Sequence, residues 1–255
     1  MPSSIRVCWQ RRLHKVIRVT IRAIWGIYAW IAFAAVVLVT LVLVAVVPGR
    51  ARRDRISTAT SRSLFILCGI KTTVSGLHNL PDGYSVVVAN HASYVDGPLL
   101  KGYLPPGFSF VIKGEMRDIP VAHFLLRRAG ARFVERHHSG GSARDARAIV
   151  KAAKGGQSLA FFAEGTFREE PGVDRFRPGA FVAAIRSEVP VVPVAITGTR
   201  HILPAKRWLP RRGPVHIEIL PAIYPGDDSY TDSKTLAEAS RQRVLAALDE
   251  PDLLA

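Results

Sequence analysis

One short segment of this chain pairs a histidine with a carboxylate: Asn90-His91-Ala92-Ser93-Tyr94-Val95-Asp96. A neutral imidazole accepts protons near pH 7, and a carboxylate on its other ring nitrogen fixes the tautomer and stabilises the imidazolium. This pair could therefore act as a general base. Five residues along a regular helix rotate a side chain by about 140°, so the two groups can meet only if the chain bends between them.

The elements around the pair predict such a bend. Residues 86–89 (Val-Val-Val-Ala) have the continuous apolar pattern of a strand in a parallel sheet, and Asp96-Gly97-Pro98 is typical of a helix start. His91 would then lie at the carboxyl end of a strand, where open α/β sheets bind ligands. On spacing alone, a polar loop without chemistry explains the segment equally well.

After residue 71, short β-rich segments alternate with amphipathic ones, which predicts an α/β fold with a mixed, largely parallel sheet flanked by helices. The expected strands are residues 72–77, 85–89, 109–112, 132–134, 158–162, 191–196 and 215–220. The expected helices are residues 97–103, 121–129, 143–153, 179–186 and 233–248. We predict two parts: a basic, membrane-associated helical region at 1–70 and an α/β domain at 71–255.

The front of the chain carries an apolar run from about residue 23 to residue 47. No Asp, Glu, Lys or Arg occurs between Arg22 and Arg50. As a helix this interval spans roughly 40 Å, which exceeds the bilayer core of about 30 Å. We therefore predict attachment to the cell membrane, with membrane lipids as partners. A signal peptide is less compatible, because its apolar region would be only about 7–15 residues long.

The net charge of +15 is concentrated beside this run, since residues 1–55 hold ten Lys or Arg against one Asp. Nucleic acid is the usual partner of such a charge, but the adjacent apolar run favours an anionic membrane surface, and we expect no nucleic-acid partner. Both flanks of the run are basic, so a single span and a segment that dips in and returns remain alternatives. Residues 58–70 form either the returning or surface-lying helix or a helix of the α/β domain.

Three further segments follow the His-Asp pair in a fixed order. Residues 130–136 (Gly-Ala-Arg-Phe-Val-Glu-Arg) predict a strand that ends in a cation, and residues 162–166 (Phe-Ala-Glu-Gly-Thr) predict a strand that ends in a turn. Residues 189–194 (Val-Pro-Val-Val-Pro-Val) are an apolar strand with two prolines. Together with Asn90-His91-x-x-x-x-Asp96, these segments resemble the four motif blocks of the 1-acylglycerol-3-phosphate O-acyltransferase family.

The resemblance implies that His91 removes a proton from an acceptor hydroxyl and that Asp96 orients His91. The hydroxyl would attack the thioester of acyl-CoA or acyl carrier protein directly, and no other cofactor is implied. Lysophosphatidic acid would give phosphatidic acid, a step of phospholipid biosynthesis, on the cytoplasmic face of the membrane. A lipid hydrolase that uses Ser93 as nucleophile is an alternative, although the chain lacks a Gly-x-Ser-x-Gly elbow.

The same resemblance implies an acceptor site made by Asn90, Arg136, Glu164, Gly165 and Thr166, with Arg177 as a secondary anion-binding residue. Guanidinium groups bind phosphate bidentately, and a glycine turn offers backbone N–H groups to an anion. Glu164 would instead orient an arginine or a glycerol hydroxyl.

The third block departs from the family pattern Phe-Pro-Glu-Gly-Thr-Arg. Ala163 replaces the proline, and Phe167 follows the threonine, with Arg168 one place later. A related acceptor such as a lyso-ornithine lipid is therefore an alternative to lysophosphatidic acid.

Other residues suggest no additional chemistry. The histidines His123, His137 and His138 share no ligand-like spacing with carboxylates, so we expect no metal site. The two cysteines, Cys8 and Cys68, support neither a disulfide framework nor a nucleophile, and a reducing cytoplasmic face is the simplest setting. An alternative from another class is a noncatalytic membrane protein that binds anionic lipids.

Overall fold

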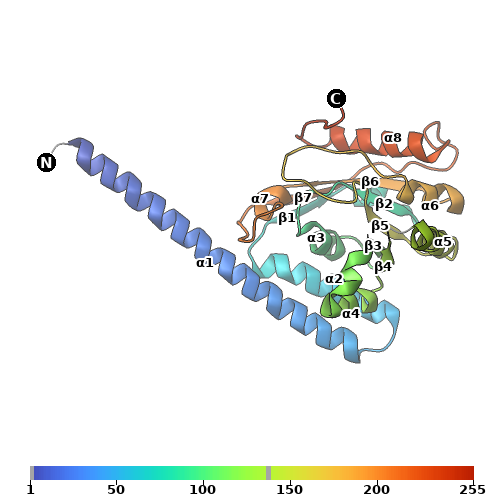
Figure 1. Cartoon of the computed structure of the whole chain (residues 1–255), viewed down its shortest axis with the longest axis horizontal. Helices are drawn as coiled ribbons and strands as arrows, with labels where there is room; N and C mark the ends of the chain where they lie inside the picture. The colour runs from blue at the N-terminus through green and yellow to red at the C-terminus, as the bar shows by residue number, and fades with distance from the viewer. Residues whose placement is uncertain (1–2, 136–138) are drawn as a thin grey trace.

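The fold is a seven-stranded sheet covered by helices on both faces (Figure 1). The computed structural model describes residues 3–135 and 139–255. The sheet order is β1-β7-β6-β2-β5-β3-β4, and only β6 and β7 pair antiparallel, which confirms the predicted mixed, largely parallel sheet. The strands are β1 (Thr72–Ser75), β2 (Val86–Ala89), β3 (Ser109–Lys113), β4 (Arg132–Val134), β5 (Leu159–Phe162), β6 (Val191–Thr197) and β7 (Val215–Ile219).

Two sets of helices cover the sheet. Helices α2 (Arg50–Leu67) and α3 (Asp96–Tyr103) pack on one face, whereas α5 (Ser139–Lys154), α6 (Gly179–Ser187) and α8 (Ser233–Ala246) pack on the other. The remaining helical elements are α1 (Ser3–Val46), α4 (Pro120–Arg128), the short α7 (Thr199–Ile202) and the 3-10 turns η1 (Leu77–Asn79) and η2 (Gly114–Asp118).

Strand β2 shows why its sequence is apolar at every position. Val87 and Ala89 face the core on the α3 side, where they join Leu99, while Val86 and Val88 face the core on the α6 side. All four residues of β2 are fully buried. A parallel strand between two helical layers has no solvent side, so the apolar run is continuous and not alternating.

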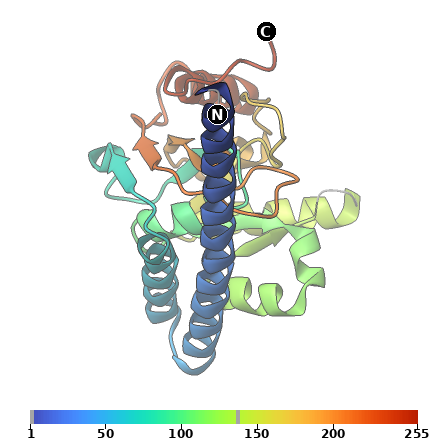
Figure 2. The same cartoon turned by 90° about the vertical axis from the view of Figure 1, so that its left-hand side faces the viewer.

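The long helix α1 lies across one side of the molecule, with α2 beside it (Figure 2). Ala29 and Ala32 of α1 and Phe65 of α2 belong to the same buried cluster as the sheet. Helix α2 begins eight residues before the expected helix at 58–70, because the chain turns at Gly49 with φ 85°. Both helices therefore contribute to the core of the α/β unit.

Among the described residues, one helical stretch is long and apolar enough to cross a membrane, His14–Val46. It includes the expected run at 23–47 except for its last residue, Val47. The end of this stretch is hydrogen-bonded to the domain, because the Arg128 guanidinium of α4 donates to the carbonyls of Val44 and Ala45 at 2.8 Å each. The beginning of α1 projects beyond the domain (Figure 1).

Candidate active site

The chain between β2 and α3 bends as the sequence predicted. His91 lies two residues after the end of β2, and Asp96 is the first residue of α3. His91 Nδ1 is 2.8 Å from Asp96 Oδ2. The pair predicted to be catalytic is therefore in direct contact at the carboxyl end of a central strand, which is the ligand-binding edge of an open α/β sheet.

Asp96 is held firmly in this loop. Its side chain is fully buried, and Oδ2 also accepts the backbone N–H groups of Ala92 (2.7 Å) and Ser93 (2.8 Å). Since this oxygen acts as an acceptor, His91 Nδ1 is the donor and Nε2 carries the free lone pair. In the described part of the chain Asp96 Oδ1 has no hydrogen-bond partner. The geometry presents Nε2 as the basic atom of the site.

Two aromatic rings hold the imidazole in place. Phe162 stacks on the His91 ring with centroids 4.3 Å apart, and Phe167 contacts it edge-on at 4.6 Å. Phe167 also meets Tyr94, at 4.7 Å. The His91 side chain remains 17% exposed, so an acceptor can reach it. Phe162 and Phe167 were not predicted as site residues, because their role depends on which strand lies beside β2.

Glu164 fastens the third block to the first. Its Oε1 accepts the backbone N–H of His91 at 2.8 Å, and Oε2 accepts that of Asp174 at 3.1 Å. Burial raises the pKa of Glu164 to about 7, although the two backbone N–H groups and the charge of Arg200 pull the pKa down. The carboxylate thus orients the histidine backbone, whereas the sequence suggested an arginine or a glycerol hydroxyl.

Asn90 has both ends of its amide occupied. Asn90 Nδ2 donates to the carbonyl of Ile196 at 3.0 Å, and Ile196 N–H donates to Asn90 Oδ1 at 2.8 Å. Asn90 is buried and continues the pairing of β2 with β6 beyond the last strand residue. These two bonds fix the end of β2 against β6, and the contact of Asn90 with the acceptor stays a prediction.

The remaining predicted acceptor residues lie near one another after β5. Gly165 (φ 79°) turns the chain and donates its N–H to Phe162, and Thr166 beside it is exposed. Arg177 is exposed and its Nε donates to the carbonyl of Glu164 at 3.1 Å. Arg136 lies outside the described residues. Gly165, Thr166 and Arg177 therefore share the same edge of the sheet as His91.

Ser93 is not placed to act as a nucleophile. It is fully buried, and its hydroxyl donates to the carbonyl of Leu203 at 2.7 Å. Cys68 is a buried member of the hydrophobic core. No group of three or more potential metal ligands occurs among the described residues.

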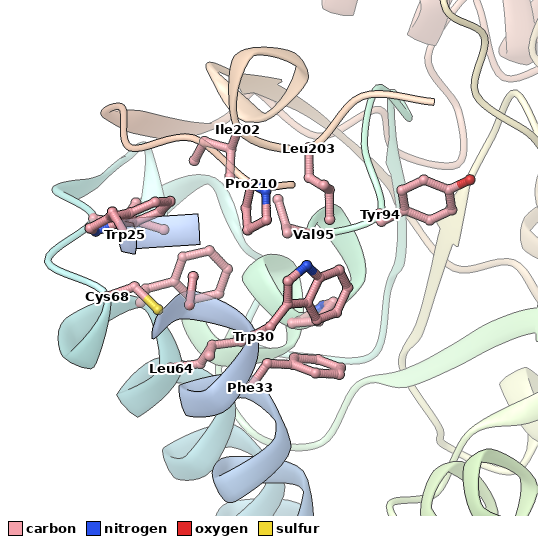
Figure 3. Close-up of a pocket in the computed structure, with 14 residues that line it drawn as sticks. Trp25, Trp30, Phe33, Leu64, Cys68, Tyr94, Val95, Ile202, Leu203 and Pro210 are labelled. Atoms are coloured by element: carbon pink, nitrogen blue, oxygen red, sulfur yellow. The ribbon is translucent and has the colours of Figure 1, made fainter. Parts of the chain in front are cut away.

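An apolar cavity of about 100 Å³ adjoins residues 90–96 between β2 and α3, the candidate catalytic loop (Figure 3). Tyr94 and Val95, which lie between His91 and Asp96 in the sequence, form part of its wall. Figure 3 shows labelled side chains converging on the cavity from α1, from α2 and the residue after it, and from α7 and the chain that follows it. The lining also includes Trp25, Ala29, Trp30, Phe33, Leu64, Phe65, Cys68, Ile70, Pro98, Ile202, Leu203 and Pro210.

The loop between β5 and α6 is fastened by the end of the chain, a feature that the motif blocks did not indicate. Arg200 forms a two-point ion pair with Glu250, at 3.0 and 2.9 Å, and donates to the carbonyls of Arg168 and Glu170. Glu250 also accepts the N–H of Gly172 at 2.9 Å. Arg200 and Glu250 thus fix the backbone of the loop that places Phe167 against His91.

Comparison with known proteins finds acyltransferases. The family model described as Acyltransferase matches residues 71–197. A chloroplast 1-acyl-sn-glycerol-3-phosphate acyltransferase of Brassica napus is 32% identical over 157 residues, which are 60% of this chain and 45% of the relative. A lyso-ornithine lipid O-acyltransferase of Pseudomonas aeruginosa is 32% identical over 177 residues, which are 63% of this chain and 66% of the relative.

The fold has a counterpart in a solved structure. The crystal structure of the 1-acyl-sn-glycerophosphate acyltransferase PlsC from Thermotoga maritima superposes with a TM-score of 0.74 and 25% sequence identity, covering 89% of this chain and 95% of that chain. The chain spans 45%, 38% and 62% of the length of the first three curated relatives. Ordered motif blocks, a matching family model and a shared fold agree, and the chain belongs to the 1-acylglycerol-3-phosphate O-acyltransferase family.

Proposed function

We propose that this protein is a membrane-associated O-acyltransferase that transfers a fatty acyl group from an acyl thioester to the free hydroxyl of a lysophospholipid. The observation that carries the proposal is the His91–Asp96 contact, while the hydroxyl of Ser93, the one serine between them, is bonded to a backbone carbonyl. A general base without a protein nucleophile suits direct transfer between two bound substrates.

The proposed reaction begins with His91 Nε2 taking the proton of the acceptor hydroxyl. The hydroxyl oxygen then attacks the thioester carbonyl carbon and forms the new ester C–O bond. As the C–S bond breaks, the departing thiolate takes the proton from the imidazolium, so the base is regenerated. Asp96 stabilises the imidazolium throughout, because its buried Oδ2 lies 2.8 Å from Nδ1.

Lysophosphatidic acid is the first acceptor to test, because 1-acyl-sn-glycerol-3-phosphate acyltransferases are prominent among the named relatives. Lyso-ornithine lipid is the second candidate. Phe167, which stands where the family pattern has an arginine, packs beside His91 and carries no charge. Arg168, one place later, forms an ion pair with Asp174 at 2.7 Å, so neither residue offers an unpaired cation to a phosphate. The Pseudomonas aeruginosa relative named for lyso-ornithine lipid also supports this second candidate.

The apolar cavity is the proposed site of an acyl chain. Its wall includes Tyr94 and Val95 of the catalytic loop, and Trp30 and Phe33 of α1 line it from the side of the long apolar helix. A chain of methylene groups gains free energy by leaving water for such a lining. The acyl donor would be acyl-CoA or acyl carrier protein, on the cytoplasmic face of the cell membrane.

The proposal is tested with the full chain purified in detergent. Lysophosphatidic acid and lyso-ornithine lipid are each supplied with a labelled acyl-CoA or acyl carrier protein, and the diacyl product is measured. Ser93→Ala is the matched control within the same loop. We expect His91→Ala to abolish product and Ser93→Ala to retain it. Undiminished turnover by His91→Ala, or an acyl group trapped on Ser93, would overturn the mechanism.

A further inference from the structure

The chain between α7 and β7 has the composition of a membrane-docking segment. This α7–β7 loop, residues 203–214, reads Leu-Pro-Ala-Lys-Arg-Trp-Leu-Pro-Arg-Arg-Gly-Pro and holds four basic residues and no acidic one. At its centre, Trp208 is 72% exposed. A tryptophan left in water beside several cations is typical of a surface that meets lipid headgroups, where the indole is partly buried and the cations are neutralised.

The loop is fixed on the apolar helix α1. Trp30 Nε1 donates to the carbonyl of Trp208 at 2.6 Å. Gly26 lets the two elements approach, because a Cβ there would lie 2.6 Å from the Leu209 side chain and 3.1 Å from the carbonyl of Pro210. Trp208 is therefore held against α1, a helix that itself carries exposed apolar residues such as Ile27 and Ile31.

Three of the four charges of the loop lack an acidic partner among the described residues. Lys206 pairs with Glu169 at 2.9 Å, but among the residues that the structure describes no acidic side chain pairs with Arg207, Arg211 or Arg212. Arg211 lies near Arg207 and near Arg22 of α1, and besides burial these like charges lower its pKa. A set of crowded, uncompensated guanidinium groups attracts an anionic surface.

The loop is also bonded to the catalytic loop. The carbonyl of Leu203 accepts both the Ser93 hydroxyl at 2.7 Å and the Tyr94 N–H at 3.3 Å. Leu203 and Pro210 line the apolar cavity, as Figure 3 shows. Whatever surface binds Trp208 is therefore placed at a fixed position relative to His91.

We propose that the α7–β7 loop is a second membrane-docking element, in which Trp208 inserts among the headgroups of an anionic bilayer while Arg207 and Arg211 bind the lipid phosphates. The occupant is a lipid surface, since an exposed indole that is flanked by cations and fixed to the apolar helix α1 complements a bilayer. This inference rests on the proposed membrane association and is independent of the acyl-transfer chemistry.

The experiment places an environment-sensitive thiol probe at single positions of the full chain, in a Cys8→Ser and Cys68→Ala background. Trp208→Cys reports the loop, Ile31→Cys reports α1, and Tyr224→Cys, an exposed aromatic of another loop, is the control. Each protein is reconstituted into vesicles of phosphatidylcholine alone or with phosphatidylglycerol, and quenching by spin-labelled lipid is measured. We expect several-fold stronger quenching at 208 than at 224, and a further increase with phosphatidylglycerol.

Charge variants test the arginines separately. In the Trp208→Cys protein, Arg207→Gln with Arg211→Gln should remove the increase caused by phosphatidylglycerol. Lys151→Gln with Arg186→Gln, the same charge loss on exposed residues of α5 and α6, should leave it unchanged. Quenching at 31 but not at 208 would refute the docking loop while membrane association stands. Absence of quenching at both positions would refute membrane association and this inference together, and equal quenching in both lipid mixtures would refute the anionic preference.

Discussion

One carboxylate oxygen of Asp96 accepts three hydrogen bonds. His91 Nδ1, Ala92 N–H and Ser93 N–H all lie 2.7–2.8 Å from Oδ2, in a side chain that water does not reach. The oxygen both orients the imidazole and shapes the backbone of the loop. Its loss should therefore affect the proton transfer and the loop geometry together.

We expect Asp96→Asn to lower kcat by about 10²–10⁴-fold, the usual contribution of a positioned general base. The asparagine oxygen can still accept the three N–H groups, but a neutral amide does not stabilise the imidazolium, and its NH₂ would replace Oδ1, which has no hydrogen-bond partner in the described part of the chain. The measurement is steady-state acyl transfer, with the thermal unfolding midpoint recorded in parallel. Asp82→Asn, at an exposed carboxylate, is the control. A kcat equal to that of the unmodified protein would exclude Asp96 from the mechanism.

Glu164 makes stability depend on pH in a defined direction. Its pKa is about 7 in the folded protein against 4.5 as the ordinary value, so the folded state binds the proton more tightly. The resulting stabilisation is complete below pH 4.5 and is lost as the pH rises through 7. The difference corresponds to about 3 kcal/mol.

Glu164→Gln removes this titration. We expect the difference in unfolding free energy between the unmodified protein and the variant to fall by about 3 kcal/mol from pH 4.5 to pH 8. Denaturant unfolding in detergent at several pH values measures it, with Glu218→Gln on β7 as the control. A difference that stays constant with pH would show that Glu164 titrates as an ordinary carboxyl in the folded state.

At the scale of elements, the strands were predictable because burial leaves a direct mark on sequence. The apolar runs of β2, β5 and β6 placed these strands within one residue of their observed ends. The role of Glu164 was not predictable, because it depends on the pairing of β5 with β2, which no local pattern encodes. The predicted start of the helix at 58 was wrong by eight residues, since the turn before α2 depends on the backbone conformation of Gly49.

The ion pair between Arg200 and Glu250 holds the β5–α6 loop in position. The ion pair is partly buried, and Arg200 also holds two backbone carbonyls of that loop. We expect Glu250→Gln to raise KM for the acceptor by about 3–10-fold, since about 1 kcal/mol of positioning is lost. Initial-rate kinetics with varied acceptor, compared with Glu238→Gln on α8, measures the effect. An unchanged KM would assign the pair to stability alone.

At the scale of the whole molecule, α1 is bonded to the domain at two distant points. Tyr28 Oη donates to the carbonyl of Leu67 at 2.9 Å, and the carbonyls of Val44 and Ala45 accept from Arg128. Seventeen residues separate the two ends, which corresponds to about 26 Å of helix lying along the protein. The opposite face of this segment is apolar and exposed, with Ile31 at 63% and Leu38 at 61%.

A helix held in this way cannot cross a bilayer while its domain stays on one side, so α1 should lie in one leaflet with both ends on the same side. We expect a membrane-impermeant thiol reagent to label Thr20→Cys and Pro48→Cys from the cytoplasmic face alone, in a background without the native cysteines. Inside-out and right-side-out vesicles distinguish the faces. Labelling of the two positions from opposite faces would establish a single span and would require α1 to detach from Arg128 in the membrane.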